Sequence, residues 1–95
     1  MKNTYMNMIA TVRGGTLEQY DKAAAELIKA NPPTGLLHHV CVPTDDGFMV
    51  IETWESEKAI EDFTTSERFQ REIGASGMPK PDLRIRPVHN MRVLS

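Results

Sequence analysis

Alternation of side chains marks the first ordered stretch of the chain, residues 4–12, and predicts a strand. Its two faces are Met6, Met8, Ala10 and Val12 on one side and Tyr5, Asn7, Ile9 and Thr11 on the other. The first face is wholly apolar and the second is mixed. Gly14-Gly15 ends the strand.

A helix is predicted next. Thr16-Leu17-Glu18-Gln19 has the form of a capping box, in which the Thr hydroxyl and the Gln side chain satisfy the free N–H groups at a helix start. One apolar stripe then recurs at helical spacing, formed by Leu17, Tyr20, Ala24, Leu27 and Ile28. Asn31-Pro32-Pro33 stops the helix, because proline disfavours helical backbone in the residue before it.

The middle of the chain predicts a hairpin. Residues 36–42 and 48–54 are strand-like, and Asp46-Gly47 in the connection is a strong turn signal. A second helix follows, capped by Ser56, with an interruption at Thr64-Thr65-Ser66 and an end near Gly74 to Gly77. A last strand is predicted over residues 83–94, with Pro87 placing part of it at an edge or bulge.

The order of strand, helix, strand, strand, helix, strand predicts a single α+β domain over residues 1–95. Two right-handed crossovers joined by a hairpin give a ferredoxin-like βαββαβ fold, a four-stranded antiparallel sheet with both helices on one face. The other face of the sheet is then uncovered. If Met6, Met8, Ala10 and Val12 lie on it, a homodimer is expected to form through this face.

The composition of the chain limits the kinds of binding partner and the cellular location that are expected. Lys and Arg number 11 against 13 Asp and Glu, so the basic excess of a nucleic-acid-binding protein is missing. No apolar run is long enough for a signal peptide or a membrane span, which predicts a cytoplasmic protein. The single cysteine, Cys41, makes no internal disulfide. With only 95 residues the core is thin, and oligomerisation is the expected remedy.

Two residues of the hairpin form the leading candidate for catalysis. An even loop between the two strands puts His39 on the same face as Glu52, directly opposite for the four-residue loop Thr44 to Gly47 and diagonal for the two-residue loop Asp46-Gly47. An odd loop brings His38 to that face instead. A carboxylate beside an imidazole fixes its tautomer and raises its basicity, so the pair is suited to proton abstraction. The alternative is a buried polar pair in which the two side chains only satisfy each other's hydrogen-bonding groups.

Further candidates are weaker. His89 follows Pro87 on the last strand and is a second candidate acid or base, unless it is a polar contact at the subunit seam. Metal binding is not expected, because the histidines show no ligand spacing and His38 and His39 point to opposite faces. The candidate substrate-binding residues are Tyr5, Asn7, Trp54, Phe63 and Asn90.

Four motifs resemble a known group of proteins. Gly35-Leu36-Leu37-His38-His39-Val40, Asp46-Gly47-Phe48, Trp54-Glu55-Ser56-Glu57-Lys58-Ala59-Ile60 and Pro87-Val88-His89-Asn90 are similar to the dimeric α+β barrel superfamily, in particular to its antibiotic-biosynthesis-monooxygenase-like domains. The resemblance implies paired sheets and a small-molecule pocket between sheet and helices in each subunit.

The resemblance also bears on cofactors. The haem-degrading branch of this superfamily resembles the chain at Asn7, but its tryptophan falls on Phe63 and its haem-ligating histidine near Ile73, which has no imidazole. No haem, flavin or metal cofactor is therefore expected. Cofactor-free oxygenation, or base-assisted cyclisation or isomerisation, of an aromatic or polyketide-like compound is the leading function. A non-catalytic dimeric ligand-binding or accessory protein is the alternative.

Overall fold

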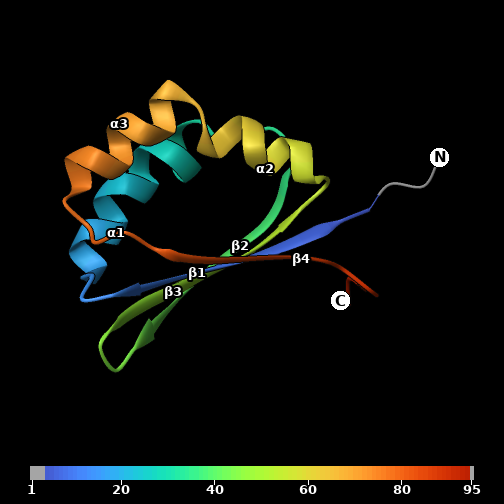
Figure 1. Ribbon diagram of the computed structural model, residues 1–95, viewed down its shortest axis with the longest axis horizontal. Coiled ribbons are helices and arrows are strands. Elements are labelled where there is room, and N and C mark those ends of the chain that lie inside the picture. Colours follow the sequence, from blue (N-terminus) through green and yellow to red (C-terminus); the bar gives the residue numbers. More distant parts are fainter. Residues whose placement is uncertain (1–3, 95) are drawn as a thin grey trace.

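The computed structural model describes residues 4–94, and its elements follow the predicted order (Figure 1). The strands are β1 (Met6–Arg13), β2 (Leu36–Thr44), β3 (Gly47–Trp54) and β4 (Asp82–Pro87). The helices are α1 (Leu17–Ala24), its π-helical continuation η1 (Ala25–Ala30), α2 (Glu57–Thr64) and α3 (Glu67–Ser76). Within residues 4–94, no helix has the length and apolar character that crossing a bilayer requires.

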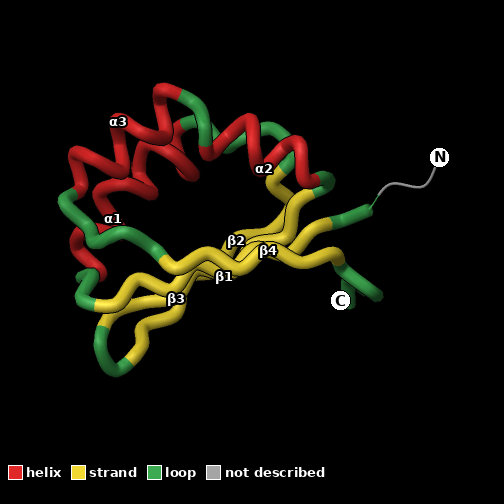
Figure 2. The backbone as a smooth tube through the Cα atoms, viewed as in Figure 1, coloured by secondary structure: helices red, strands yellow, loops and turns green. Residues whose placement is uncertain are grey.

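The strands form one antiparallel sheet in the order β2-β3-β1-β4. All helices lie on one side of it, as Figure 2 shows. This arrangement confirms the predicted ferredoxin-like α+β fold. The two βαβ crossovers put β1 and β3 in the centre of the sheet and leave β2 and β4 as edges.

The helix starts follow the predicted capping. The Thr16 hydroxyl accepts a hydrogen bond from the Gln19 backbone N–H at 3.1 Å, and the Gln19 side chain accepts from the Thr16 N–H at 3.0 Å. Ser56 and Ser66 cap α2 and α3 in the same way, each accepting from the N–H three residues on. Because Ser66 restarts the helix, the predicted interruption divides it into two segments.

One arginine ties two helical segments together. The Arg68 guanidinium, on α3, donates to the backbone carbonyls of Glu26, Leu27 and Asn31 at the end of η1. Carbonyls in and just beyond the last turn of a helix run short of intrahelical N–H partners, and the guanidinium supplies donors at this position. Arg68 therefore caps η1 and fixes α3 beside it above the sheet.

The apolar face of β1 is covered by the helices, so its expected role as the uncovered dimer face is wrong. Met6, Met8, Ala10 and Val12 are between 2% and 8% exposed. Met6 and Met8 belong to a core cluster with Leu27, Ile60 and Phe63 from the helices. The helices carry apolar stripes that need an apolar partner surface, and this face provides it.

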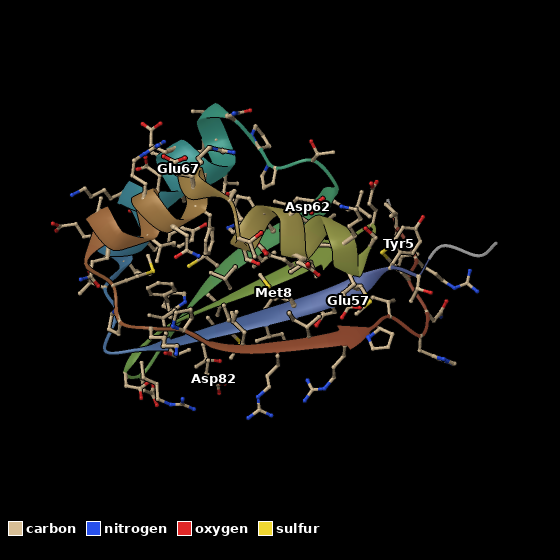
Figure 3. The ribbon with its side chains drawn as sticks, turned by 45° about the horizontal axis from the view of Figure 1, so that its top comes forward. Tyr5, Met8, Glu57, Asp62, Glu67 and Asp82 are labelled. Carbon is tan, nitrogen blue, oxygen red and sulfur yellow. The ribbon has the colours of Figure 1, made fainter. Side chains whose placement is uncertain are left out.

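The open face of the sheet is the mixed one. Asn7, Ile9 and Thr11 point to it, and the register places Arg86, Arg84 and Asp82 of β4 beside them. In Figure 3 the labelled Met8 projects from β1 toward the helices, whereas Asp82 projects from the opposite side of the sheet. The face left for a partner therefore combines an apolar centre with a charged edge.

The last strand is shorter than predicted. β4 ends at Pro87, and residues 88–94 have no regular structure. The Val88 N–H still donates to the Tyr5 carbonyl at 2.8 Å, but Pro87 itself has no N–H to continue the ladder. All six residues of β4 are exposed, including the helix-side Leu83 and Ile85.

The hairpin has the predicted even register, with Asp45-Asp46 as its two-residue loop and Thr44 paired with Gly47. Gly47 lies in the strand, and its φ is not positive. A Cβ added there would collide with the carbonyl oxygen of Val12 on β1. The glycine is therefore required by the close approach of β1, and the turn conformation does not demand it.

Candidate active site

A histidine and a glutamate face each other across β2 and β3 on the helix side of the sheet. His39 and Glu52 are direct cross-strand partners. Nδ1 of His39 lies 2.6 Å from Oε2 of Glu52, a hydrogen-bond and ion-pair distance. The contact predicted from the hairpin register is therefore present, with the two residues directly opposite.

The Glu52 carboxylate is buried and fully partnered. Only 3% of the residue is exposed. Its second oxygen, Oε1, accepts a hydrogen bond from the indole Nε1–H of Trp54 at 3.0 Å. A buried carboxylate costs several kcal/mol unless it is hydrogen-bonded or paired. Trp54 and His39 together meet this need and hold the carboxylate in one orientation.

A tyrosine from α1 completes the chain of hydrogen bonds. The Tyr20 hydroxyl lies 2.5 Å from Nε2 of His39, and the two rings stack with centroids 5.9 Å apart. Tyr20 belongs to the predicted apolar stripe, and this role of its hydroxyl was not predicted. The available signal was a hydroxyl-bearing residue within an otherwise aliphatic stripe that faces the sheet.

The direction of these hydrogen bonds follows from the chemistry of the groups. The Glu52 carboxylate only accepts, so Nδ1 of His39 carries the proton and Nε2 presents its lone pair. Burial, followed by the nearby Cys41 and Glu52, raises the pKa of Tyr20 to about 12. Tyr20 is therefore a neutral phenol that donates to Nε2, and a proton path runs from Tyr20 to His39.

This network borders a cavity of about 90 Å³ between the sheet and the helices. His39, Tyr20, Glu52 and Thr64 are the polar residues of its lining. The other lining residues are apolar and come from strands and helices alike, among them Met8, Val50, Phe63, Phe69 and Leu83. Among residues 4–94, no Lys or Arg lines it. The exposed surface of the lining is apolar, so the hydrogen-bond network lies in the wall of an apolar cavity with its polar atoms turned toward one another.

The structure brings only some of the predicted site residues to this cavity. His39, Glu52 and Phe63 line it, and Trp54 is a fully buried core residue that reaches it only through Glu52. Asn7 lies on the open sheet face, where its side chain donates to the backbone carbonyl of Glu52 at 3.1 Å. Asn7 therefore points away from the cavity.

Three other predicted residues also lie outside the lining. Tyr5 is 40% exposed at the start of the sheet. His89 and Asn90 are exposed in the irregular segment after β4. The expectation that His89 is a second base in the pocket depended on a strand continuing past Pro87. Because the strand stops there, His89 is separated from the cavity, and His39 is its only histidine.

Cys41 lies two residues from His39 and packs against an apolar cluster formed by Ala10, Val12, Phe48 and Val50. Burial, with Asp21 as a smaller cause, raises the pKa of its thiol. Since the thiolate is the reactive form, Cys41 is a poor nucleophile. Among residues 4–94 there is no group of three or more His, Cys, Asp or Glu side chains placed to hold a metal ion.

Several solved structures share this fold. A conserved protein of unknown function from Bacteroides thetaiotaomicron is 18% identical, with a TM-score of 0.71, and the match covers 92% of this chain and 100% of that one. A candidate antibiotic biosynthesis monooxygenase from Chloroflexus aurantiacus is 17% identical, with a TM-score of 0.68 and coverage of 96% and 99%.

A third similar structure has a described activity. SnoaB from Streptomyces nogalater, a cofactor-independent oxygenase, is 14% identical, with a TM-score of 0.67 and coverage of 96% and 97%. At these identities the likeness concerns the fold. No curated protein matches the chain. The family model for antibiotic biosynthesis monooxygenase matches residues 4–73, which include the whole Tyr20–His39–Glu52–Trp54 network. The chain therefore belongs to the antibiotic biosynthesis monooxygenase family.

Proposed function

We propose that this protein is a cofactor-independent oxygenase that removes a proton from a phenol or an enolisable ketone and exposes the resulting anion to dioxygen. One observation carries the proposal: a carboxylate-braced imidazole, linked to a phenol, borders an otherwise apolar cavity. The family membership and the fold shared with SnoaB support the same chemistry.

The proton follows the existing hydrogen bonds. The substrate hydroxyl gives its proton to the Tyr20 oxygen while the Tyr20 proton passes to Nε2 of His39, so that Tyr20 stays neutral throughout. The products are a substrate anion and an imidazolium beside the Glu52 carboxylate, which stabilises the new charge. The apolar surroundings strengthen this attraction because the local dielectric constant is low.

Dioxygen then oxidises the anion. A carbon–oxygen bond forms between the electron-rich carbon and O2, and proton return from His39 gives a hydroperoxide. Loss of water from the hydroperoxide leaves a carbonyl group, so one oxygen atom ends in the product and the other in water. The substrate supplies the electrons, and the protein supplies the base and the apolar cavity.

Binding of para-nitrophenol tests the base directly, because its phenolate absorbs visible light and its neutral form does not. At a pH below the pKa of the free phenol, the wild-type protein should raise the ionised fraction of the bound dye. His39→Ala should abolish this rise. His38→Ala, a neighbouring change on the open face, should leave it intact. Equal ionisation with wild type and His39→Ala would refute His39 as the base.

Oxygen uptake separates the reaction types. With an anthrone or a naphthoquinol as substrate, the oxygenase predicts one O2 consumed per product and no turnover under anaerobic conditions. Base-assisted cyclisation or isomerisation uses the same proton transfer without O2 and is the second candidate. A non-catalytic binding protein is favoured by one fact: among the described residues, every buried side-chain nitrogen and oxygen already has a partner. Binding without turnover would support that alternative.

We also propose that the protein pairs with a second copy through the open face of the sheet. The register sets Val40, Ile51 and Ile9 side by side across three strands of this face. A domain of this size buries a limited core, and pairing of two such faces adds apolar contact area. The homodimer expected through the face of the sheet away from the helices therefore stays a proposal, with these three residues in place of the apolar face of β1.

Ile51→Lys is expected to separate the two copies without unfolding them. The new ammonium would lie in the middle of the paired faces with no counter-charge, whereas in a monomer it would reach water. Sedimentation at micromolar concentration should show the mass fall by half, with the circular dichroism spectrum unchanged. Glu61→Lys, an exposed change on α2, is the control. A monomeric wild type, or a dimeric Ile51→Lys variant, would contradict the proposal.

A further inference from the structure

The floor of the cavity runs across the whole sheet. In one row, His39 of β2 is followed by Glu52, Met8 and Ile85 of the next three strands. In the adjacent row, Cys41 is followed by Val50, Ala10 and Leu83. Neighbouring strands lie about 4.8 Å apart, so β2 and β4 are separated by roughly 14 Å. His39 is therefore at one edge of the sheet and Leu83 at the other.

Helix cover ends before the far edge. In these two rows, the residues of the central strands β1 and β3 are at most 9% exposed. Leu83 is 42% exposed and Ile85 40% exposed, although both point to the helix side. Leu83 also lines the cavity. The apolar floor thus continues without a break from the enclosed part of the cavity onto an open shelf formed by Leu83 and Ile85.

Size and charge define what fits. The cavity of about 90 Å³ is smaller than the ~150 Å³ cavity that holds benzene in an engineered protein, so a substituted ring cannot be fully enclosed. Within the part of the chain that the structure describes, the lining has no Lys or Arg to receive a carboxylate or phosphate. We therefore expect a ligand without a carboxylate or phosphate, part of which lies outside the cavity.

We propose that the substrate is an elongated, uncharged amphiphile whose hydroxyl head binds at Tyr20 and His39 and whose apolar body lies over the shelf of Leu83 and Ile85. Leu83, at the point where the cavity opens, is the residue on which the gain in affinity with chain length depends. The identity of the head group rests on the proposed function. The position of the body rests on the exposed apolar side chains of β4.

Binding of para-alkylphenols measures the contributions of the hydroxyl head and of the apolar body separately. Isothermal titration with para-ethylphenol, para-hexylphenol and para-octylphenol should show affinity rising with chain length, by up to roughly fourfold per methylene that becomes fully buried. We expect para-hexylphenol to bind at least about tenfold more tightly than para-ethylphenol. This gain is smaller than full burial of the added methylenes would give, because the chain lies partly on an open surface.

Leu83→Asp should remove most of this chain-length gain and leave the binding of para-ethylphenol within about twofold. Leu83→Gln, which adds no charge, should act in the same direction and protects the test against misfolding of the first variant. Leu37→Asp is the matched control, since Leu37 is 50% exposed on the other edge strand and does not line the cavity. It should keep the full gain.

The outcomes for the head and the body are distinct. His39→Ala should weaken all the alkylphenols by a common factor with the chain-length gain unchanged. No effect of His39→Ala would contradict the proposed function and leave the shelf proposal standing. A full chain-length gain in both Leu83 variants, or an equal loss in Leu37→Asp, would overturn the shelf proposal. Dissociation of a dimer by Leu83→Asp without any change in binding would show that a second copy covers the shelf, which also overturns it.

Discussion

Glu52→Gln should yield a folded protein whose turnover of a phenolic substrate falls about a thousandfold or more. The amide has nearly the same shape, and its oxygen can still accept the Trp54 indole N–H. Its NH2 group, however, would donate to Nδ1 of His39 and reverse the tautomer. Nε2 would then carry the proton and have no lone pair for the proton from Tyr20. In a related carboxylate–histidine pair, this kind of reversal costs about ten-thousandfold.

Two measurements separate a catalytic pair from a structural one. Oxygen uptake gives kcat, and nitrogen NMR of the imidazole shows which ring nitrogen is protonated. Both should change in Glu52→Gln, while the thermal unfolding midpoint changes little. Glu55→Gln, an exposed neighbour just beyond β3, is the control and should match wild type. Full turnover in Glu52→Gln would mean that His39 and Glu52 only serve as hydrogen-bond partners for each other in the interior.

Met8→Asp should prevent stable folding. Met8 is 6% exposed and lies in the cluster of Leu27, Ile60 and Phe63, with no cation among the residues of that cluster. The change removes apolar contacts and buries a carboxylate without a partner, a combined cost on the order of 5 kcal/mol. Domains of this kind are stable by about 5–15 kcal/mol in total, so most or all of the stability is lost.

The neighbouring residue of the same strand supplies the control. Ile9→Asp places the same charge one position along β1, on the open face. Its effect should fall on association between copies, with the monomer still folded. Urea unfolding and sedimentation of the two variants distinguish these results. A stable Met8→Asp monomer, or an unfolded Ile9→Asp variant, would contradict the assignment of the two faces.

Much of the fold could be predicted because its signals are local. The capping box at Thr16, the serine caps of α2 and α3 and the even hairpin each depend on residues within a few positions of one another. The His39–Glu52 contact was predictable for the same reason, since a short loop fixes which residues of a hairpin stand opposite each other. This prediction required only the types of the two side chains and the number of residues, odd or even, that separates them through the loop.

The missed features depend on packing between distant segments. An apolar face on β1 indicates that something covers it. The sequence pattern is the same whether helices or a second subunit provide the cover. The Tyr20 hydroxyl finds its partner through the placement of α1 over β2, which helical periodicity does not encode. The wrong placement of His89 in the cavity has a more local cause. Strand pairing ends at Pro87, whereas the sequence pattern predicts a strand that continues past Pro87 with an edge or bulge there.

The bulge in β2 affects which changes of chain length the site tolerates. One extra residue, Leu37, lies between the pairs Leu36–Trp54 and His38–Thr53, so the ladder is already interrupted on that side of His39. From His39 to the loop the pairing is continuous. Insertions or deletions in the connection from η1 to β2 therefore leave the imidazole opposite its carboxylate. A single residue added between His39 and Thr44, with the pairing at the loop unchanged, would turn His39 to the other side of the sheet. Changes of length are therefore harmless before the strand and disabling within it.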